Sequence, residues 1–410
     1  MSALRSVEEQ LGRILATTRV LPAAAVPVIS ARGATLAEPI LAAGDIPVFD
    51  NSAMDGFAVR FADVADAAPD APVTLRVVAD LPAGTPLDPP LAAGEAARIM
   101  TGSPVPTDAD TIVPFEDTAA GLSGGLDDVV VVSAPHHEGV FVRRRGGDLR
   151  TGDEVMAPGT RLGPFQVAAA IAAGVTHVTV VRAPRVAVVS TGSELRGPDE
   201  TGGAGSIPDS NGPLLAGLVV DADAEVVLAA RVGDDPGEVL RVTRDAEAAG
   251  ADVIVFTGGV SAGAFEPVRG AFEGGPIEFA KVAMQPGKPQ AFGMLPSGAL
   301  VFGLPGNPVS VAVSFEVFVR PTLLQLQGRA VITRPTMTLA AAVSWRTPPG
   351  RRQYLPAIVD PDAGTVRPAT AGGSGSHLAG GLARAQAFAI VSADIDEVAV
   401  GDAVDVMLVS

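Results

Sequence analysis

The stretch from Val301 to Pro321, VFGLPGNPVSVAVSFEVFVRP, most narrowly limits how this chain can fold. The apolar run from Ala299 to Gly303 predicts a short buried strand, and the run from Val309 to Val319 predicts a helix. Between them lies a kinked LPGN loop, in which Asn307 is a good helix N-cap because its side chain accepts hydrogen bonds from free backbone N–H groups. Pro308 suits the first helical position, where no N–H is needed.

Pro321 is expected to end this helix, because proline lacks the N–H that continues the hydrogen-bond ladder. A helix that is apolar on nearly all sides must be deeply buried. Its first turn directs free N–H groups and a partial positive charge toward whatever lies over the carboxyl end of the strand. The sequence therefore predicts a strand, a tight loop and a core helix whose start suits an anion.

Two earlier apolar strands also end in glycine loops. Arg185 to Ser190 runs into Thr191-Gly192, and Asp252 to Phe256 runs into Thr257-Gly258-Gly259. Three apolar strands that alternate with helices predict a parallel sheet covered on both sides. Ligands bind such sheets at the carboxyl ends of the strands, and converging backbone donors suit phosphate or carboxylate. The intervening helices are expected to begin at Asp209-Ser210-Asn211 and at Asp235-Pro236-Gly237-Glu238.

Outside this region the hydrophobic pattern of the sequence is different. The 410 residues are enough for about three domains. From about 45 to 141, and again from about 329 to 410, short β-type runs separated by Pro, Gly and Asp predict two small β domains. The α/β pattern occupies about 183 to 328. Helices are expected at Ser6 to Thr17, where Ser6 and Glu9 form a capping box, and at Gly163 to Ala173.

The charge and the missing residue types exclude several functions. A net charge of −17 disfavours a general nucleic-acid binder, although it leaves room for an anionic small ligand. The absence of Cys excludes disulfides, thiolate metal sites and a Cys nucleophile. The N-terminus lacks an apolar signal core, and no apolar run is long enough to predict a transmembrane helix. We therefore expect a soluble, cytoplasmic protein without a membrane partner.

Several charged residues lie near the glycine loops in sequence. Lys281 and Lys288 precede the third loop, and Lys288 is held between Gly287 and Pro289, which is unusual for a lysine that only aids solubility. Carboxylates suited to Mg²⁺ shared with phosphates occur at Glu194, Asp234 and Glu266. Each signal is weak alone: a Gly-Gly or Asp-Gly pair is usually only a turn. The residues by themselves name no reaction.

Taken together, the motifs resemble those of the molybdopterin molybdenumtransferase family, the MoeA-type enzymes that are similar to the C-terminal domain of gephyrin. The motifs occur in one order that spans about residues 5 to 405. They are Ser52-Ala53-Met54-Asp55-Gly56, Thr101-Gly102-x-x-x-Pro106, Ser190-Thr191-Gly192-Ser193-Glu194-Leu195, Asp209-Ser210-Asn211, Gly258-Gly259-Val260-Ser261, Pro286-Gly287-Lys288-Pro289 and Leu304-Pro305-Gly306-Asn307-Pro308-Val309-Ser310.

This resemblance implies a multidomain α/β plus β protein that forms an elongated homodimer. Residues 1–44 and 142–182 would form a discontinuous linking domain around an inserted β domain at 45–141. A three-layer α/β molybdopterin-binding domain at 183–328 and a C-terminal β barrel at 329–410 would follow. The implied reaction converts adenylyl-molybdopterin and molybdate into molybdenum cofactor and AMP with Mg²⁺. The site would be shared between subunits, with no nucleic acid or membrane involved.

The resemblance also assigns residues to roles. The implied catalytic residues are Asp55, Thr101, Asp148, Glu194, Asp234, Glu266 and Lys281. The implied molybdopterin and AMP contacts are Ser190, Thr191, Gly192, Gly258, Gly259, Ser261, Pro305, Gly306, Asn307 and Pro308. Molybdate would bind at Gln285, Lys288, Arg351 and Ser376, and Mg²⁺ at Glu194, Asp234 and Glu266.

Two positions depart from the family pattern. Glu266 stands where the family usually has Asp, so its carboxylate reaches one methylene further. Gln285 stands where many members have Lys, which removes a positive charge from the implied molybdate pocket but keeps a donor. Two alternatives to the transferase are a non-catalytic scaffold or pterin-binding member, and an adenylyltransferase with the same α/β domain. The two β domains argue against the latter.

Overall fold

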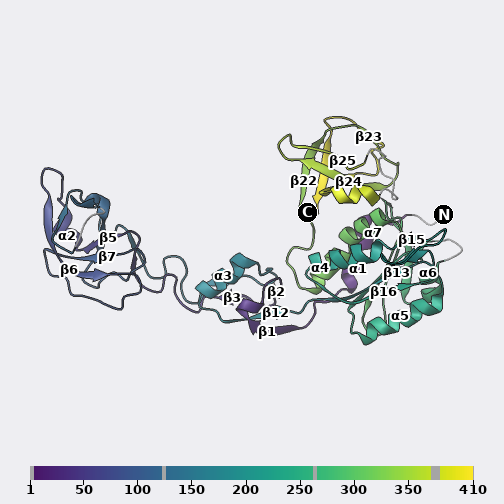
Figure 1. The fold of residues 1–410 in the computed structure, drawn as a ribbon, viewed down its shortest axis with the longest axis horizontal. Helices are drawn as coiled ribbons and strands as arrows, with labels where there is room; N and C mark the ends of the chain where they lie inside the picture. Colours follow the sequence, from purple (N-terminus) through teal and green to yellow (C-terminus); the bar gives the residue numbers. More distant parts are fainter. Residues whose placement is uncertain (1–3, 122–125, 262–265, 371–378, 410) are drawn as a thin grey trace.

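The computed structural model describes residues 4–121, 126–261, 266–370 and 379–409. Figure 1 shows an elongated molecule with a β lobe at one end, a small middle lobe, and an α/β domain with a second β unit above it at the other end. Both termini lie at the α/β end. The chain therefore runs out from the α/β end to the far lobe and back again.

The α/β domain is built on a six-stranded sheet whose order is β16-β13-β17-β21-β20-β18. The first four strands in this order are parallel, whereas β20 runs antiparallel to both β21 and β18. The three strands predicted to be parallel, β13, β17 and β21, are parallel, but the sheet as a whole is mixed because β20 runs against the other five strands. The connections before and after β20 are too short for a crossover helix, and short connections join antiparallel strands. The strands are β13 (Arg185–Thr191), β16 (Glu225–Val232), β17 (Val253–Thr257), β18 (Ile277–Lys281), β20 (Pro289–Met294) and β21 (Leu300–Leu304).

Helices cover both faces of this sheet, as the sequence predicted. On one face, Val186 and Val188 pack in a cluster with Leu215 of α4 and Val311 of α7. On the other face, α5 and α6 pack against the sheet in a second cluster. The helices are α1 (Val7–Thr17), α4 (Asn211–Asp221), α5 (Pro236–Ala248), α6 (Pro267–Phe272), α7 (Pro308–Ser314) and α8 (Arg320–Leu326).

The core helix does not end at Pro321. After α7 it continues as a π-helical segment, η4 (Phe315–Val319), and then as α8, in which Pro321 is the second residue. The wider π turn before the proline makes room for its ring and tolerates the hydrogen bond that its missing N–H cannot form. The combined helix from Pro308 to Leu326 is long and apolar enough to cross a membrane, but 89% of it is buried inside the protein, as in the core helix of a globular domain.

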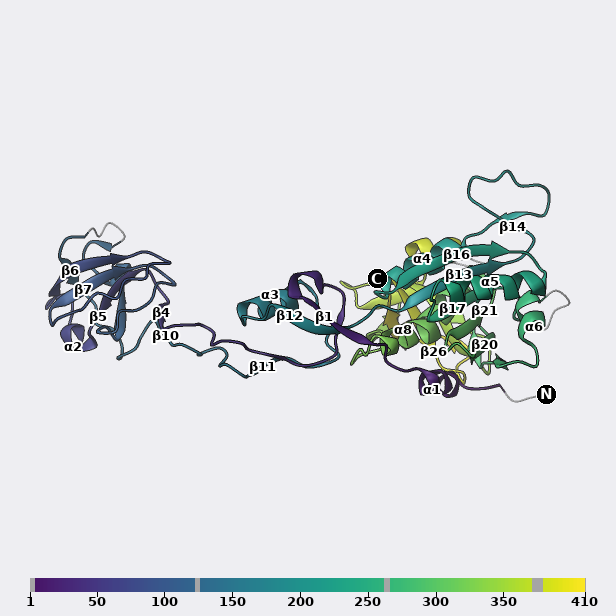
Figure 2. The same ribbon diagram turned by 90° about the horizontal axis from the view of Figure 1, so that it is seen from below.

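The far lobe is a five-stranded sheet of order β8-β5-β7-β6-β9, whose apolar side chains pack around Phe57 and Val113. Its strands are β5 (Gly56–Val59), β6 (Val73–Leu81), β7 (Glu95–Ile99), β8 (Thr111–Pro114) and β9 (Val129–Val131), with α2 (Phe61–Val64) and η2 (Phe115–Asp117). Two chain segments that run side by side connect this lobe to the middle lobe (Figure 2). They pair as β4 (Asn51–Ser52) with β10 (Val142–Arg143) and as β3 (Ile40–Leu41) with β11 (Glu154–Met156).

The middle lobe packs a small sheet of order β1-β12-β2 against α3. Its elements are β1 (Ala23–Pro27), η1 (Val28–Ser30), β2 (Thr35–Leu36), α3 (Pro164–Ala172) and β12 (His177–Val181). Segments from the beginning of the chain and from residues 164–181 thus form one lobe, with the far lobe inserted between them in sequence.

The C-terminal β unit closes on itself. Its sheet order is β24-β25-β22-β28-β26, and β26 pairs again with β24, which completes a five-stranded barrel. A further short strand, β19 (Met284–Gln285), extends from the α/β domain and pairs with β24. The barrel elements are β22 (Thr336–Ala341), β23 (Trp345–Arg346), β24 (Arg352–Asp360), β25 (Thr365–Pro368), η5 (Ala379–Arg384), β26 (Ala387–Val391), β27 (Glu397–Val398) and β28 (Ala403–Leu408).

Candidate functional site

A cavity of about 910 Å³ lies at the carboxyl ends of β13, β17 and β21. The loops that follow these three strands form much of its wall, and the segment from Met284 to Pro289 and Arg351 of the barrel complete it. The cavity thus lies where the sequence predicted a ligand. The sequence-predicted residues that line it are Thr191, Gly192, Glu194, Asp234, Gly258, Gly259, Ser261, Glu266, Gln285, Lys288, Pro305, Gly306, Asn307, Pro308 and Arg351.

Glycine is required where the loops meet. Gly258 has a φ of +90°, and a Cβ at this position would lie 2.8 Å from the backbone oxygen of Thr191. The N–H of Gly258 donates to the backbone oxygen of Leu304 at 2.9 Å. The hydroxyl of Thr191 donates to the backbone oxygen of Thr257 at 3.2 Å. These contacts tie the ends of the three strands together, so the loops behave as one wall.

Asn211 is a cavity residue that we did not include among the predicted site residues. Its side chain is 7% exposed, and its Nδ2 donates to Thr257 Oγ1 at 2.8 Å and to the backbone oxygen of Gly306 at 2.7 Å. The sequence signals were the family motif Asp209-Ser210-Asn211 and the helix cap, where Asp209 Oδ1 accepts from the N–H groups of Asn211 and Gly212. Asn211 therefore joins α4 to the second and third loops.

The third loop differs in one detail from the expectation. Asn307 occupies the N-cap position of α7 with extended backbone, but its side chain makes no capping hydrogen bond. Pro308 is the first helical residue, as predicted. The side chain of Asn307 is exposed at the cavity and is not used to close the first turn, so its position rather than its capping contact was correctly predicted.

The three carboxylates predicted to bind metal line the cavity, but they do not form a ready-made metal site. Asp234 Oδ2 accepts from the N–H of Ser193 at 3.2 Å, and Glu266 Oε2 accepts from the N–H of Ser261 at 2.8 Å. Within the described ranges, no group of three or more carboxylates or histidines could hold a metal ion. Asp234 is thus held by the loop after β13 and Glu266 by its own loop, and the assignment of Glu194, Asp234 and Glu266 as Mg²⁺ ligands stays a prediction.

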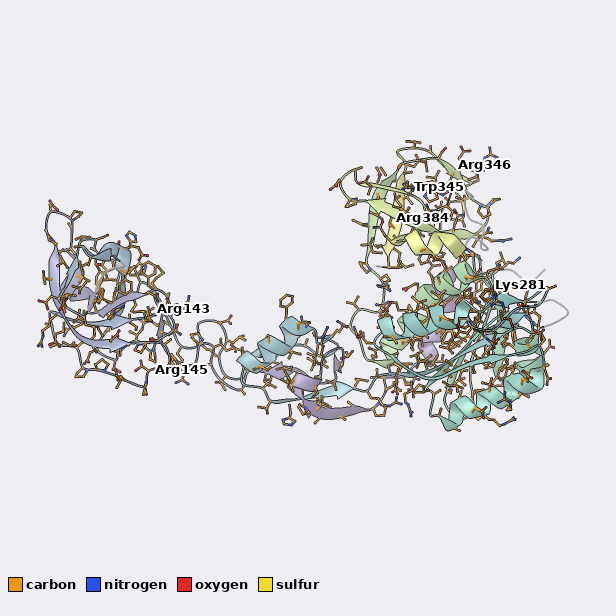
Figure 3. All side chains as sticks on the ribbon, in the orientation of Figure 1. Arg143, Arg145, Lys281, Trp345, Arg346 and Arg384 are labelled. Atoms are coloured by element: carbon orange, nitrogen blue, oxygen red, sulfur yellow. The ribbon has the colours of Figure 1, made fainter. Side chains whose placement is uncertain are left out.

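The cations divide between the cavity and the surface. Lys288 is half-buried in the cavity wall. Lys281 is exposed at the end of β18 and is not among the lining residues, although it lies in the α/β domain (Figure 3). Arg351 comes from the barrel, and its Nη1 donates to Gln285 Oε1 at 3.1 Å. The pairing of β19 with β24 places these two residues together, since the N–H of Arg352 donates to the backbone oxygen of Ala283 at 3.0 Å.

Asp55, Thr101 and Asp148 are not brought to the cavity within one chain. They belong to the far lobe and to the segments that connect it, at the opposite end of the molecule (Figure 1). Arg143, next to this connection, lies far from Lys281 in Figure 3. Ser190 is also missing from the lining, because it is fully buried, and Ser376 lies outside the described residues.

Asp55 and Thr101 nevertheless form a well-defined pair. The backbone N–H and the hydroxyl of Thr101 donate to Asp55 Oδ1 at 2.6 and 2.7 Å. The backbone hydrogen bond, followed by that of the hydroxyl, lowers the pKa of Asp55 below its ordinary value. The carboxylate is exposed and ionised at neutral pH, so it is available to a group outside its own lobe.

Comparisons with known proteins agree along nearly the whole chain. Three family models match in order: the MoeA N-terminal region (domain I and II) at residues 5–174, a probable molybdopterin binding domain at 187–325, and the MoeA C-terminal region (domain IV) at 338–409. The chain is 41% identical over 405 residues to molybdopterin molybdenumtransferase 2 of Mycobacterium tuberculosis, which covers 97% of this chain and 98% of that protein.

Two further relatives extend the comparison. Molybdopterin molybdenumtransferase of Synechococcus elongatus is 37% identical over 358 residues, covering 85% of this chain and 86% of that protein. A crystal structure of a molybdopterin biosynthesis MoeA protein from Pyrococcus horikoshii OT3 is 27% identical, with a TM-score of 0.84 over 99% of this chain and 100% of that one.

The α/β domain with its anion-suited cavity, the closed barrel that reaches into the cavity and the inserted β lobe define a multidomain pterin-binding type of protein. The sequence relatives make this more specific. The chain belongs to the molybdopterin molybdenumtransferase family.

Proposed function

We propose that this protein is a cytoplasmic enzyme that inserts molybdenum into adenylyl-molybdopterin, yielding molybdenum cofactor and AMP. The observation that carries the proposal is the cavity in which Lys288 and Arg351 face the backbone loops of three strand ends. A phosphorylated ligand and a tetrahedral oxyanion both need such a combination of fixed cations and N–H groups. Family membership supports molybdopterin and molybdate as the two anions.

We assign the two anions to different walls of the cavity. The glycine loops at Gly192, Gly258 and Gly306 let the backbone approach the phosphate of the pterin, as a Cβ would not. Molybdate binds on the other wall, where Lys288 and Arg351 supply charge and Gln285 orients the guanidinium of Arg351. Ser376, the fourth implied molybdate ligand, lies outside the described residues.

The cavity also fits Mg²⁺ shared with a substrate. Mg²⁺ is usually held by one or two carboxylates together with substrate phosphates, and it retains several waters. Glu194, Asp234 and Glu266 line the same cavity, so any one or two of them would suffice without a complete protein cage. When bound, the ion neutralises charge on the pyrophosphate bond that is cleaved.

A homodimer with shared sites accounts for the residues that lie far from the cavity. The carboxylate of Asp55 is exposed and is fixed by Thr101 at a distance from its own cavity. A second copy of the chain would bring this pair, and Asp148, to the cavity of its partner. The two-fold symmetry of a dimer then completes two equal sites.

The direct test is to incubate the purified protein with adenylyl-molybdopterin, molybdate and Mg²⁺ and to measure AMP. We expect AMP release that depends on molybdate and stops when a chelator removes Mg²⁺. Arg351→Gln should raise the KM for molybdate. AMP release no greater than that of a protein-free control would refute the enzymatic proposal. Retained binding of molybdopterin in that case would favour the scaffold alternative.

A further inference from the structure

A buried ion pair joins the core helix to the root of the barrel. Glu316, in the middle of the π-helical segment η4, is 4% exposed. Its two oxygens accept from Arg334, at 2.8 Å from Nε and 3.0 Å from Nη2. Arg320, one turn later on the helix, places its Nε 3.8 Å from the same carboxylate. Such a bidentate pair has a fixed geometry as well as a charge.

This pair lies at the junction between the α/β domain and the barrel. Arg334 lies two residues before β22, where the chain leaves the α/β domain and enters the barrel. The barrel is attached a second time through the pairing of β19 with β24, which holds Arg352 and Gln353 against Met284 and Gln285. The ion pair between Arg352 and Glu8 of α1 reinforces this second attachment.

These two polar attachments act together with apolar packing, since Tyr354, Phe388 and Met407 of the barrel are buried in the same cluster as the core helix. Arg351 directly precedes β24 and is the barrel residue that lines the cavity. Apolar packing has no preferred direction, so without the ion pair only the β19–β24 pairing would set the orientation of the barrel. We propose that Glu316 is a positioning residue, which fixes the orientation of the barrel through Arg334 and thereby holds Arg351 in the cavity. This inference rests on the proposed function only for the identity of the anion that Arg351 meets.

The experiment must separate positioning from folding. Removing one partner of a buried pair leaves an uncompensated charge and threatens the fold, whereas removing both does not. Because Arg320 faces the same carboxylate, the test variant is Glu316→Gln with both Arg320→Met and Arg334→Met. The matched control is Asp252→Asn with Arg182→Met, which removes another bidentate pair, with distances of 2.6 Å, between the α/β domain and the middle lobe. Thermal unfolding should show that the test variant and the control both remain folded.

The orientation of the barrel can be measured without any assay of activity. Because the chain has no Cys, Leu240→Cys on α5 and Val400→Cys on the barrel give two unique sites for spin labels. We expect a narrow distance distribution in the otherwise unchanged chain and in the control. The test variant should give a broader or shifted distribution. An unchanged distribution in the test variant would overturn the proposal.

Kinetics test the link to Arg351. We expect the test variant to raise the KM for molybdate about tenfold with a smaller effect on kcat, since even a misplacement of about 1 Å has large effects. The control should leave both unchanged. A broadened distance distribution with an unchanged KM would overturn the link if Arg351→Gln raises the KM by itself. If Arg351→Gln also has no effect, the role of Arg351 in the proposed function fails, while the distance result still supports the positioning of the barrel.

Discussion

At the scale of single residues, the lowered pKa of Asp55 can be traced to one partner, Thr101. Replacing Thr101 by Val removes the hydroxyl donor at 2.7 Å but keeps the backbone donor. We expect the pKa of Asp55 to rise toward its ordinary value, which carboxyl NMR during an acid titration will measure. The lowered pKa stabilises the fold at neutral pH. This stabilisation is lost as the pH falls through the folded-state pKa, so the variant should differ from the parent mainly at neutral pH.

The far lobe offers a matched control for this titration. Thr107 donates to Asp88 through the same two groups, both at 2.8 Å, and the pKa of Asp88 is likewise lowered. Thr107→Val should raise the pKa of Asp88 and leave that of Asp55 unchanged. If Thr101→Val left the pKa of Asp55 unchanged, the hydroxyl would not stabilise the carboxylate.

Two substitutions of Gln285 separate the effect of positive charge in the cavity on the KM for molybdate from the effect of how Arg351 is oriented. Gln285→Lys adds a positive charge at the wall where Lys288 and Arg351 lie, so we expect a lower KM for molybdate. Gln285→Met keeps the size but removes the acceptor for Arg351, and it should raise this KM. Steady-state AMP release at varied molybdate concentrations distinguishes the two. A higher KM for Gln285→Lys would mean that the contact with Arg351 outweighs the added charge.

At the scale of elements, the meeting of the three loops depends on one glycine. Gly258→Ala combines an unfavourable φ of +90° with a clash at 2.8 Å against the backbone of Thr191. We expect a loss of roughly 1–3 kcal/mol in the free energy of unfolding and a marked loss of turnover. Gly298→Ala is the control, since its φ is +91° but no atom lies within 4 Å of the added Cβ. Urea unfolding of both variants measures the difference, and equal losses would argue against the clash.

The elements themselves were largely predictable from local sequence. Apolar runs bounded by Gly and Pro located strands such as β13 and β17 to within a residue, because burial and turn chemistry act over a few residues. The antiparallel strand β20 and the passage of the core helix through Pro321 were missed. Both depend on neighbours: strand direction on connection length, and the tolerated proline on the π turn before it.

The site was predictable in part, for the same reason. Thr191, Gly258 and Pro308 follow strands or start a helix, so local patterns placed them at one sheet edge. Arg351 was reached only through the family resemblance, because the barrel that carries it packs on the α/β domain through contacts between distant residues. Asn211 was named as part of a helix cap and of a family motif but not as a site residue, although its amide joins two loops. The resemblance named the carboxylates but gave no information on their spacing.

At the scale of the whole molecule, the shared-site proposal predicts complementation between damaged subunits. Asp55→Asn and Glu194→Gln should each cut turnover strongly and leave the fold intact, because both side chains are exposed. Mixed dimers containing one copy of each variant would have one site with both substitutions and one intact site. Random subunit exchange should therefore restore about a quarter of the original turnover. Analytical ultracentrifugation checks that dimers form.

Lack of complementation in verified mixed dimers would contradict the shared site, as would a protein that sediments only as a monomer. A useful control mixes two variants from the same cavity, Glu194→Gln and Lys288→Met. In that pair, each cavity carries one substitution regardless of how the subunits combine. Restored turnover in this control would point to exchange of material between cavities and not to a shared wall.

The paired segments between the middle and far lobes have a consequence for how the protein can be rebuilt. Because Ile40 and Leu41 lie opposite Met156 and Glu154, the far lobe leaves and rejoins the chain at neighbouring points. It is an insertion that a short β-turn could replace without separating the ends of the middle lobe. If the site is shared as proposed, the truncated chain would keep its own cavity but lose Asp55 and Thr101, which complete the cavity of a second copy. One polypeptide could then supply the far lobe and another the cavity, and each could be mutated independently of the other.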